Sequence, residues 1–171
     1  ACGIEPGMQV SAAFVLAPQL CLRARDPAKE ARALAGIAVW AGQFTPTVSL
    51  ACGDTVLLEI GGCLRLFGGL RRLAGHLRAG LSELGYEVVA AVAPTPTGAL
   101  WLARAGIATS IGDRHALRRA LAPLRLQCLD QPADTVAALA GMGVHTVRDC
   151  LGLPRDGLAR RFGQTLLDDL D

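Results

Sequence analysis

The stretch VSLACGDTVLLEI, residues 48–60, decides the fold class of this chain. Two short β-prone runs, residues 48–51 and 55–60, flank the tripeptide Cys52-Gly53-Asp54. A connection of this length is typical of antiparallel hairpins, and the Gly61-Gly62 pair ends the second run. We therefore expect a β-hairpin that carries Asp54 at its turn.

Helical patterns lie on both sides of this hairpin. Upstream, Asp26-Pro27 joins an N-cap residue to a proline at the first helical position, which predicts a helix reaching about Phe44. Downstream, apolar residues at 70, 73, 74, 77, 81 and 84 recur at helical spacing, and Gly85 is expected to cap that helix. A shorter helical pattern spans residues 8–16, and residues 20–25 alternate like a short strand.

Residues 86–93 form a valine-rich run that predicts a strand buried on both faces, and Pro94-Thr95-Pro96 leads into a helix ending near Arg104. With one more strand in front, the order of these elements becomes βαββαβ. That order is typical of a ferredoxin-like α+β sandwich (split βαβ), in which two helices cover one face of four antiparallel strands. We expect that the first strand precedes Ala1 and that both ends of the chain are cut.

From about Arg125 the pattern changes to short helices and tight turns. Gln131-Pro132 starts one predicted helix, Gly141-Met142-Gly143-Val144 makes a turn, and Thr146 begins the next helix. This is the sequence form of a helix-hairpin-helix, whose glycines admit a tight turn and leave main-chain N–H groups for a phosphate. Residues 157–171 are predicted to form a single further helix.

Composition narrows the function classes. With 51% hydrophobic and 19% charged residues, the chain can bury an ordinary core, which excludes disordered, collagenous and coiled-coil proteins. No apolar run approaches the 18 residues of a membrane span. The net charge is only +2, but 16 of the 17 basic residues are arginine, which suits phosphate contacts, so nucleic-acid binding stays open.

The six cysteines carry no metal motif. They stand at positions 2, 21, 52, 63, 128 and 150, without a Cys-x-x-Cys pair and without histidine at zinc spacing. We expect no structural zinc and favour free buried thiols in a reducing cytoplasm over disulfides. The glycines at 61, 62, 68 and 69 lack the spacing of a phosphate loop.

Taken in order, several short motifs resemble the Y-family (lesion-bypass) DNA polymerases, and within them the ImuB-type branch that lacks the catalytic set. The landmarks are Gly3-Ile4-x-x-Gly7-Met8, Ala17-Pro18, Phe44-Thr45-Pro46-x-Val48, the hairpin from Asp54 to Gly61, Ala91-Val92-Ala93-Pro94 and Gly143-Val144-x-Thr146-Val147-x-Asp149. Together they span nearly the whole chain. The resemblance implies a remnant of the fingers at residues 1–25, a palm at 26–124 and a thumb with the helix-hairpin-helix at 125–171.

The resemblance also implies that the catalytic site is lost. Active members carry a Ser-Ile-Asp-Glu run whose adjacent carboxylates bind metal ions, and here Asp54 remains while Thr55 replaces the glutamate. Pro96 stands where active members have a phosphate-binding lysine. Glu59 is expected to face away from Asp54, because side chains alternate along a strand. No catalytic residue, metal or cofactor is therefore expected; Mg²⁺ bound through Asp54 belongs to the alternative of an active polymerase.

The resemblance implies a non-catalytic protein that binds primer–template DNA in bacterial translesion synthesis. Its implied partners are a RecA-like accessory protein, an error-prone C-family DNA polymerase and the sliding clamp, all in the cytoplasm, with no membrane contact. The little finger and clamp-binding segment would follow residue 171. The residues expected to contact DNA are Gly141, Gly143, Val144, His145, Thr146, Arg155, Arg160 and Arg161. Two alternatives remain open, an active lesion-bypass polymerase and a purely protein-interacting module.

Overall fold

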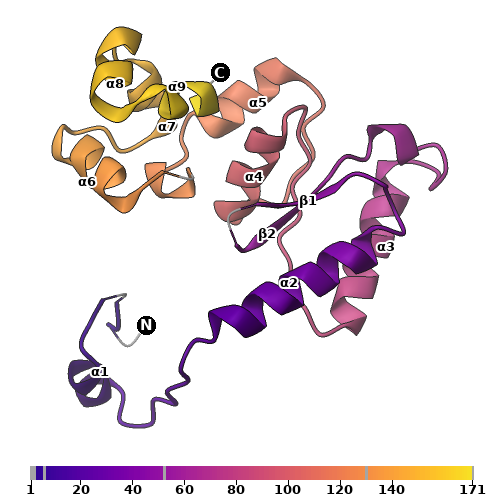
Figure 1. Ribbon diagram of the computed structural model, residues 1–171, viewed down its shortest axis with the longest axis horizontal. Helices are drawn as coiled ribbons and strands as arrows, with labels where there is room; N and C mark the ends of the chain where they lie inside the picture. Colours follow the sequence, from indigo (N-terminus) through magenta and orange to yellow (C-terminus); the bar gives the residue numbers. More distant parts are fainter. Residues whose placement is uncertain (1–2, 6, 52, 130, 171) are drawn as a thin grey trace. The chain divides into compact units, whose positions relative to one another are not determined.

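The computed structural model describes residues 3–5, 7–51, 53–129 and 131–170. The chain divides into two compact units, residues 1–33 and 34–171, with the boundary inside helix α2. Figure 1 shows the helices and strands of both units, coloured along the sequence. The predicted divisions at residues 25 and 125 stay predictions.

The first unit holds helix α1 (Val10–Leu16) and the start of α2 (Pro27–Ala41). The N-cap prediction for Asp26 is confirmed, because its Oδ1 accepts the Lys29 N–H at 3.0 Å. The predicted strand at 20–25 is wrong: these residues form no ladder, and positions 21–25 are all exposed. An alternating pattern makes a strand only where a neighbouring strand supplies main-chain partners.

In the second unit, β1 (Val48–Ala51) and β2 (Thr55–Leu58) pair antiparallel, which confirms the predicted hairpin. The register places Val48 opposite Leu58 and Ala51 opposite Thr55. Thr45, which is buried, fixes the entry to β1 because its Oγ1 donates to the Glu59 carbonyl at 2.5 Å. The single-turn 3₁₀ helix η1 (Gly61–Cys63) follows β2.

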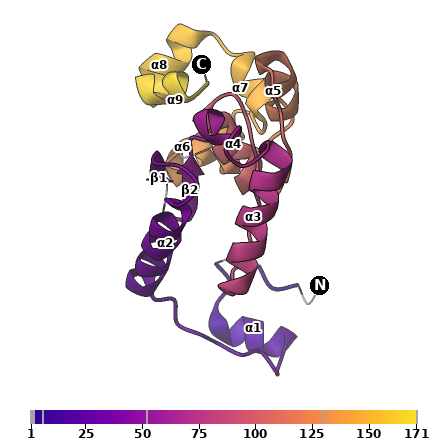
Figure 2. The same ribbon diagram turned by 90° about the vertical axis from the view of Figure 1, so that its right-hand side faces the viewer.

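Helix α3 (Leu70–Glu83) matches the predicted amphipathic helix and buries Leu73 and Leu81. Gly85, at φ 82°, ends it as predicted, and the Tyr86 N–H returns to the Leu81 carbonyl at 2.9 Å. Trp40 of α2 packs directly against α3 at Gly80, where a Cβ would collide with the indole ring. Figure 2 shows α2 and α3 as the two long helices beside the hairpin.

The predicted buried strand at 86–93 is wrong. Only Val92 forms a bridge, parallel to Ser110, and Tyr86, Val88 and Val89 are exposed. Within the described residues β2 pairs with β1 alone, so no strand lies beside this segment to complete a ladder. The second unit is therefore a mixed α/β structure with a two-stranded sheet in its described part, where three strands were predicted.

A large apolar groove borders the segment that was predicted to be a strand. It has a volume of about 1110 Å³ and is lined by β2, α2, α3 and residues 86–93, with Ile37, Leu57, Leu77 and Val89 among its walls. The free edge of β2 and the extended segment 86–91 both border it. The groove thus combines apolar walls with main-chain groups that carry no ladder hydrogen bonds.

The main core lies in the C-terminal half of the second unit. It is built from α4 (Pro96–Arg104), α5 (Arg114–Leu121), the 3₁₀ helix η2 (Leu126–Cys128), α6 (Ala133–Gly141), α7 (Val147–Leu151), α8 (Arg155–Phe162) and α9 (Gln164–Leu170). Leu102, Leu126, Leu139, Cys150 and Leu166 are the most deeply buried members of this core. One continuous cluster crosses residue 125, from Leu100 to Leu167.

Two features here differ from the sequence analysis. The single helix predicted for 157–171 is two helices, because Gly163 at φ 89° breaks the chain between α8 and α9. Helix α5 was not predicted, although Asp113 caps it by accepting the Ala116 N–H at 2.8 Å. Of the cysteines that the structure describes, Cys63, Cys128 and Cys150 are free and at least partly buried, whereas Cys21 is free but exposed. No helix in the described residues is long and apolar enough to cross a membrane.

Replacing Leu102 by alanine should lower the free energy of unfolding by about 2–5 kcal/mol, because the side chain is 0% exposed and its removal leaves a cavity. Leu66→Ala is the matched control, since Leu66 is 82% exposed and should change stability by less than about 0.5 kcal/mol. Urea unfolding followed by circular dichroism measures both. Equal effects of the two substitutions would contradict the core described here.

Candidate functional site

The turn between α6 and α7 was predicted to offer free main-chain N–H groups to a phosphate. Gly143 does adopt φ 80°, as a tight turn requires. However, every N–H from 142 to 146 already has an acceptor inside the protein. The bonds are Met142 to Leu139 O (3.0 Å), Gly143 to Ala140 O (2.9 Å), Val144 to Leu139 O (3.1 Å), and His145 and Thr146 to Asp149 Oδ2 (3.2 and 2.9 Å). The main-chain donors of this turn are therefore not free as expected, and DNA contact at residues 141–146 stays a prediction.

The Asp149 carboxylate accepts hydrogen bonds from two main-chain N–H groups of this turn. It forms a capping box with Thr146, whose Oγ1 accepts the Asp149 N–H at 3.2 Å. The Thr146 side chain, followed by the N–H groups of His145 and Thr146, holds the pKa of the Asp149 carboxyl below its usual range. The carboxylate thus takes up the two donors that would otherwise face a ligand.

A short main-chain pairing holds this turn against the preceding segment. The Leu126 N–H donates to His145 O at 3.1 Å, and the Val147 N–H donates to Leu124 O at 2.9 Å. A third bond joins the Arg148 N–H to Ala122 O at 2.9 Å. Residues 122–126 therefore run antiparallel to 145–148, and alternate residues point into the core and toward solvent.

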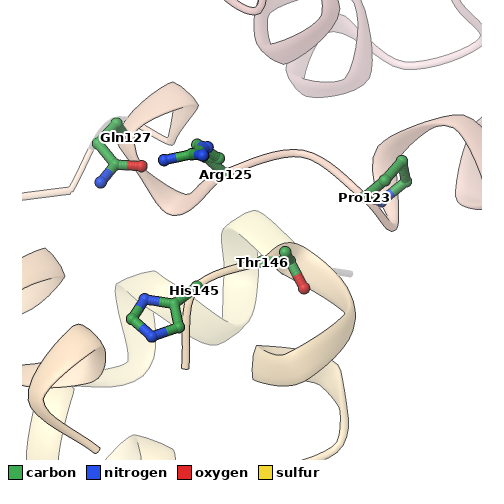
Figure 3. Close-up of a pocket in the computed structure, with 5 residues that line it drawn as sticks. All are labelled: Pro123, Arg125, Gln127, His145 and Thr146. Atoms are coloured by element: carbon green, nitrogen blue, oxygen red, sulfur yellow. The ribbon is translucent and has the colours of Figure 1, made fainter. Parts of the chain in front are cut away.

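On the solvent side of this pairing lies a pocket of about 480 Å³, lined by Pro123, Arg125, Gln127, His145 and Thr146. Figure 3 shows the side chains of Arg125, Gln127 and His145 around one hollow. A guanidinium, an amide and an imidazole supply N–H donors, which is the chemistry that receives a phosphate oxygen. We call these three residues the donor pocket. Of them, sequence analysis had singled out only His145.

The remaining predicted contacts lie on the last helices. Arg155, Arg160 and Arg161 are all exposed on α8, and the Arg161 guanidinium lies 5.6 Å from the Phe162 ring centroid. Successive helical residues turn by about 100°, so Arg160 and Arg161 point in different directions and the three do not form one stripe. Their role in DNA binding stays a prediction.

The turn of the β-hairpin holds Asp54 in an ion pair that the sequence did not indicate. Asp54 Oδ1 lies 3.1 Å from Nη2 of Arg104, at the end of α4, and accepts the Thr55 hydroxyl at 2.8 Å. Arg104 is 18% exposed and Asp54 is 62% exposed. The carboxylate that the resemblance predicts to remain from a metal-binding run thus faces a positive charge.

A catalytic metal does not fit this turn as it stands. Thr55 supplies a neutral hydroxyl in place of a second carboxylate, and Glu59 accepts the Gly61 N–H at 2.8 Å at the opposite end of β2. At about 3.3 Å per strand residue, Glu59 lies on the order of 15 Å from Asp54. Among the described residues no three His, Cys, Asp or Glu side chains lie close enough to share a metal.

Pro96, where the resemblance predicts that active members carry lysine, has a structural role of its own. It occupies the first turn of α4, directly after the N-cap Thr95, whose Oγ1 accepts the Gly98 N–H at 3.2 Å. Proline is pre-organised for this position because its missing N–H needs no partner there. Gly98 is also required, since a Cβ would lie 2.7 Å from Leu117 Cδ2. This segment is built to start a helix and offers no cation at position 96.

The capping box makes stability depend on pH. Because the folded state lowers the pKa of Asp149, its ionised form stabilises the fold above the ordinary aspartate pKa, and this contribution is lost as the pH falls through the lowered value. Asp149→Ala should therefore lower Tm at pH 7, and the deficit should shrink as the pH falls below about 4. Thermal melts between pH 7 and pH 2 measure this. A deficit that is constant with pH would show that the ionised carboxylate is not the stabilising group.

Comparison with known proteins agrees with the resemblance seen in the sequence. The chain is 34% identical over 170 residues to the protein ImuB of Caulobacter vibrioides, in strains NA1000/CB15N and ATCC 19089/CB 15. The match covers 99% of this chain and 37% of each relative, so the chain spans little more than a third of their length.

Solved polymerases share the fold. DinB from Sulfolobus solfataricus matches with a TM-score of 0.70 at 16% identity, and a ternary complex of Dbh DNA polymerase matches with 0.73 at 17%. Each match covers 99% of this chain and 52% of the other. The model of the impB/mucB/samB family matches residues 1–104, more than half of the chain. The chain therefore belongs to the impB/mucB/samB family and has a Y-family-polymerase-like fold.

Proposed function

We propose that this protein holds primer–template DNA without transferring nucleotides and helps to assemble a bacterial translesion synthesis complex. The observation that carries the proposal is the ion pair between Asp54 and Arg104, with a neutral Thr55 beside it. A polymerase active site needs adjacent carboxylates free to bind two metal ions. Here the remaining carboxylate is neutralised inside an otherwise family-like frame.

The donor pocket supports DNA binding. Arg125, Gln127 and His145 are exposed and surround one hollow beside the α6–α7 turn. Since the main-chain groups of the turn are engaged, side chains would carry the contact to the DNA backbone. Phosphate contacts of this kind do not read bases, so affinity should be similar for unrelated sequences and should fall with salt.

We further propose the finer architecture that the family resemblance implies, a palm followed by a thumb that begins near Arg125. The groove bordered by β2 and residues 86–91 supports a palm sheet completed by one more strand. That strand would precede Ala1, and the apolar walls at Leu57, Leu77 and Val89 would receive its side chains. The free edge of β2 would supply ladder partners on one side and residues 86–91 on the other.

The partners follow from the family by analogy. The relatives named ImuB support a role in the response to DNA damage. We propose that the protein acts in the cytoplasm with a RecA-like accessory protein, an error-prone C-family DNA polymerase and the sliding clamp. These partners rest on family resemblance alone.

Hydrogen exchange can test the completed sheet. In a protein that carries the proposed strand ahead of Ala1, the amides of Val88, Val89 and Ala90 should exchange at least tenfold more slowly than in the 171-residue chain, because ladder hydrogen bonds would protect them. The amides of Leu139 and Val144, inside the core in either form, are the internal control. Equal exchange of residues 88–90 in both proteins would contradict a strand in the groove.

The function itself is tested with the full-length protein on primer–template DNA. We expect salt-dependent binding without primer extension in Mg²⁺ or Mn²⁺, on undamaged and lesion-bearing templates. The double variant Arg125→Ala/Gln127→Ala should weaken binding about tenfold on unrelated sequences, since a charged hydrogen bond contributes roughly 1.5–3 kcal/mol. Arg71→Ala, which removes an exposed arginine on α3, is the matched control.

The outcomes separate the alternatives. Extension that is lost in Asp54→Ala would establish an active polymerase with an unusual metal site. Absence of salt-dependent affinity for DNA would favour a protein-interacting module. Equal affinities of the pocket variant and Arg71→Ala would remove the donor pocket from the DNA interface.

A further inference from the structure

Arg104 forms an ion pair with the hairpin turn from a distant part of the chain. It lies in the last turn of α4, 50 residues after Asp54, and only 18% of its side chain is exposed. A cation at the C-terminal end of a helix is favoured by the partial negative charge there. Its position in the helix and the Asp54 carboxylate thus both favour a positive charge at Arg104.

Arg104 lies close to other elements of the second unit and carries a constant positive charge. Helix α4 contacts both β2 and η2, and the Arg104 charge opposes the rise in pKa that burial causes at the Cys128 thiol of η2. Arginine stays protonated at every accessible pH, so this positive charge does not switch off. It is a permanent cation inside the fold.

The same oxygen of Asp54 receives two donors. Oδ1 lies 3.1 Å from Arg104 Nη2 and 2.8 Å from Thr55 Oγ1. A divalent ion that bound this oxygen would compete with both donors and sit next to a guanidinium, where like charges repel. The barrier to metal binding is therefore separate from the loss of a carboxylate at position 55.

We propose that Arg104 is the resident cation of this turn and excludes a divalent metal from Asp54. The inference rests on the proposed non-catalytic function and deepens it. If it holds, restoring a glutamate at position 55 does not restore a metal site while Arg104 remains. Thr55, which supplies no carboxylate, and Arg104, which supplies a positive charge, then oppose metal binding at Asp54 independently of each other.

The test measures Mn²⁺ binding to the full-length protein in the absence of DNA, through the electron paramagnetic resonance signal of free Mn²⁺. Thr55→Glu alone should bind as weakly as the unmodified protein. Thr55→Glu combined with Arg104→Gln should bind at least tenfold more tightly. Thr55→Glu with Arg104→Lys keeps the charge and should stay weak, and Thr55→Gln with Arg104→Gln, which adds no carboxylate, should also stay weak.

Two results overturn the proposal. The first is Mn²⁺ binding by Thr55→Glu with Arg104 in place, which needs no change at Arg104 and so does not depend on how that variant folds. The second is equal affinity of Thr55→Glu with and without Arg104, including no binding by either, in variants whose circular dichroism matches the unmodified protein. If Arg104→Gln unfolds, Arg104→Met keeps the apolar stem and takes its place. Neither result bears on DNA affinity, so failure here and failure of the proposed function are distinguishable.

Discussion

Three main-chain hydrogen bonds between residues 122–126 and 145–148 are the constraint on which the C-terminal half depends. They fix the end of α5 against the start of α7, and so place Leu124, Leu126 and Val147 in the core. Because neighbouring side chains on an extended segment point to opposite sides, the same bonds turn Arg125 outward. Core and donor pocket are thus two faces of one pairing.

The α6–α7 turn illustrates how a motif can keep its shape and change its chemistry. Gly143 and the capping box of Thr146 with Asp149 produce the tight geometry that the sequence indicated. Yet the Asp149 carboxylate accepts the donors that a phosphate would need. A capping aspartate stabilises the helix start and competes with an external anion, so an anion bound here would have to be held by side chains.

In the hairpin turn, too, a charged side chain of the protein occupies the groups that could bind a ligand, and here the charge is positive. Asp54 stands where the resemblance predicts a metal-binding carboxylate, but Arg104 reaches it from the end of α4 and supplies a positive charge from within the protein. Arg104 is largely buried while Asp54 is 62% exposed, and the proposed role of this pair is to keep a metal ion away from the carboxylate. Pro96 is likewise explained by the helix that it starts.

Local signals in the sequence determined the hairpin at 48–58, the capped starts of α2, α4 and α7, and the amphipathic α3, because turns, caps and helical spacing act over a few residues. They also indicated the family, and the resemblance predicted a retained Asp54 beside altered positions 55 and 96. The strand predicted from the valine run at 86–93 is wrong, since a strand exists only where another strand pairs with it. The Asp54–Arg104 ion pair and the donor pocket were also not predicted from the sequence. Only the tertiary structure decides them, because they join residues up to 50 positions apart whose approach no local spacing encodes.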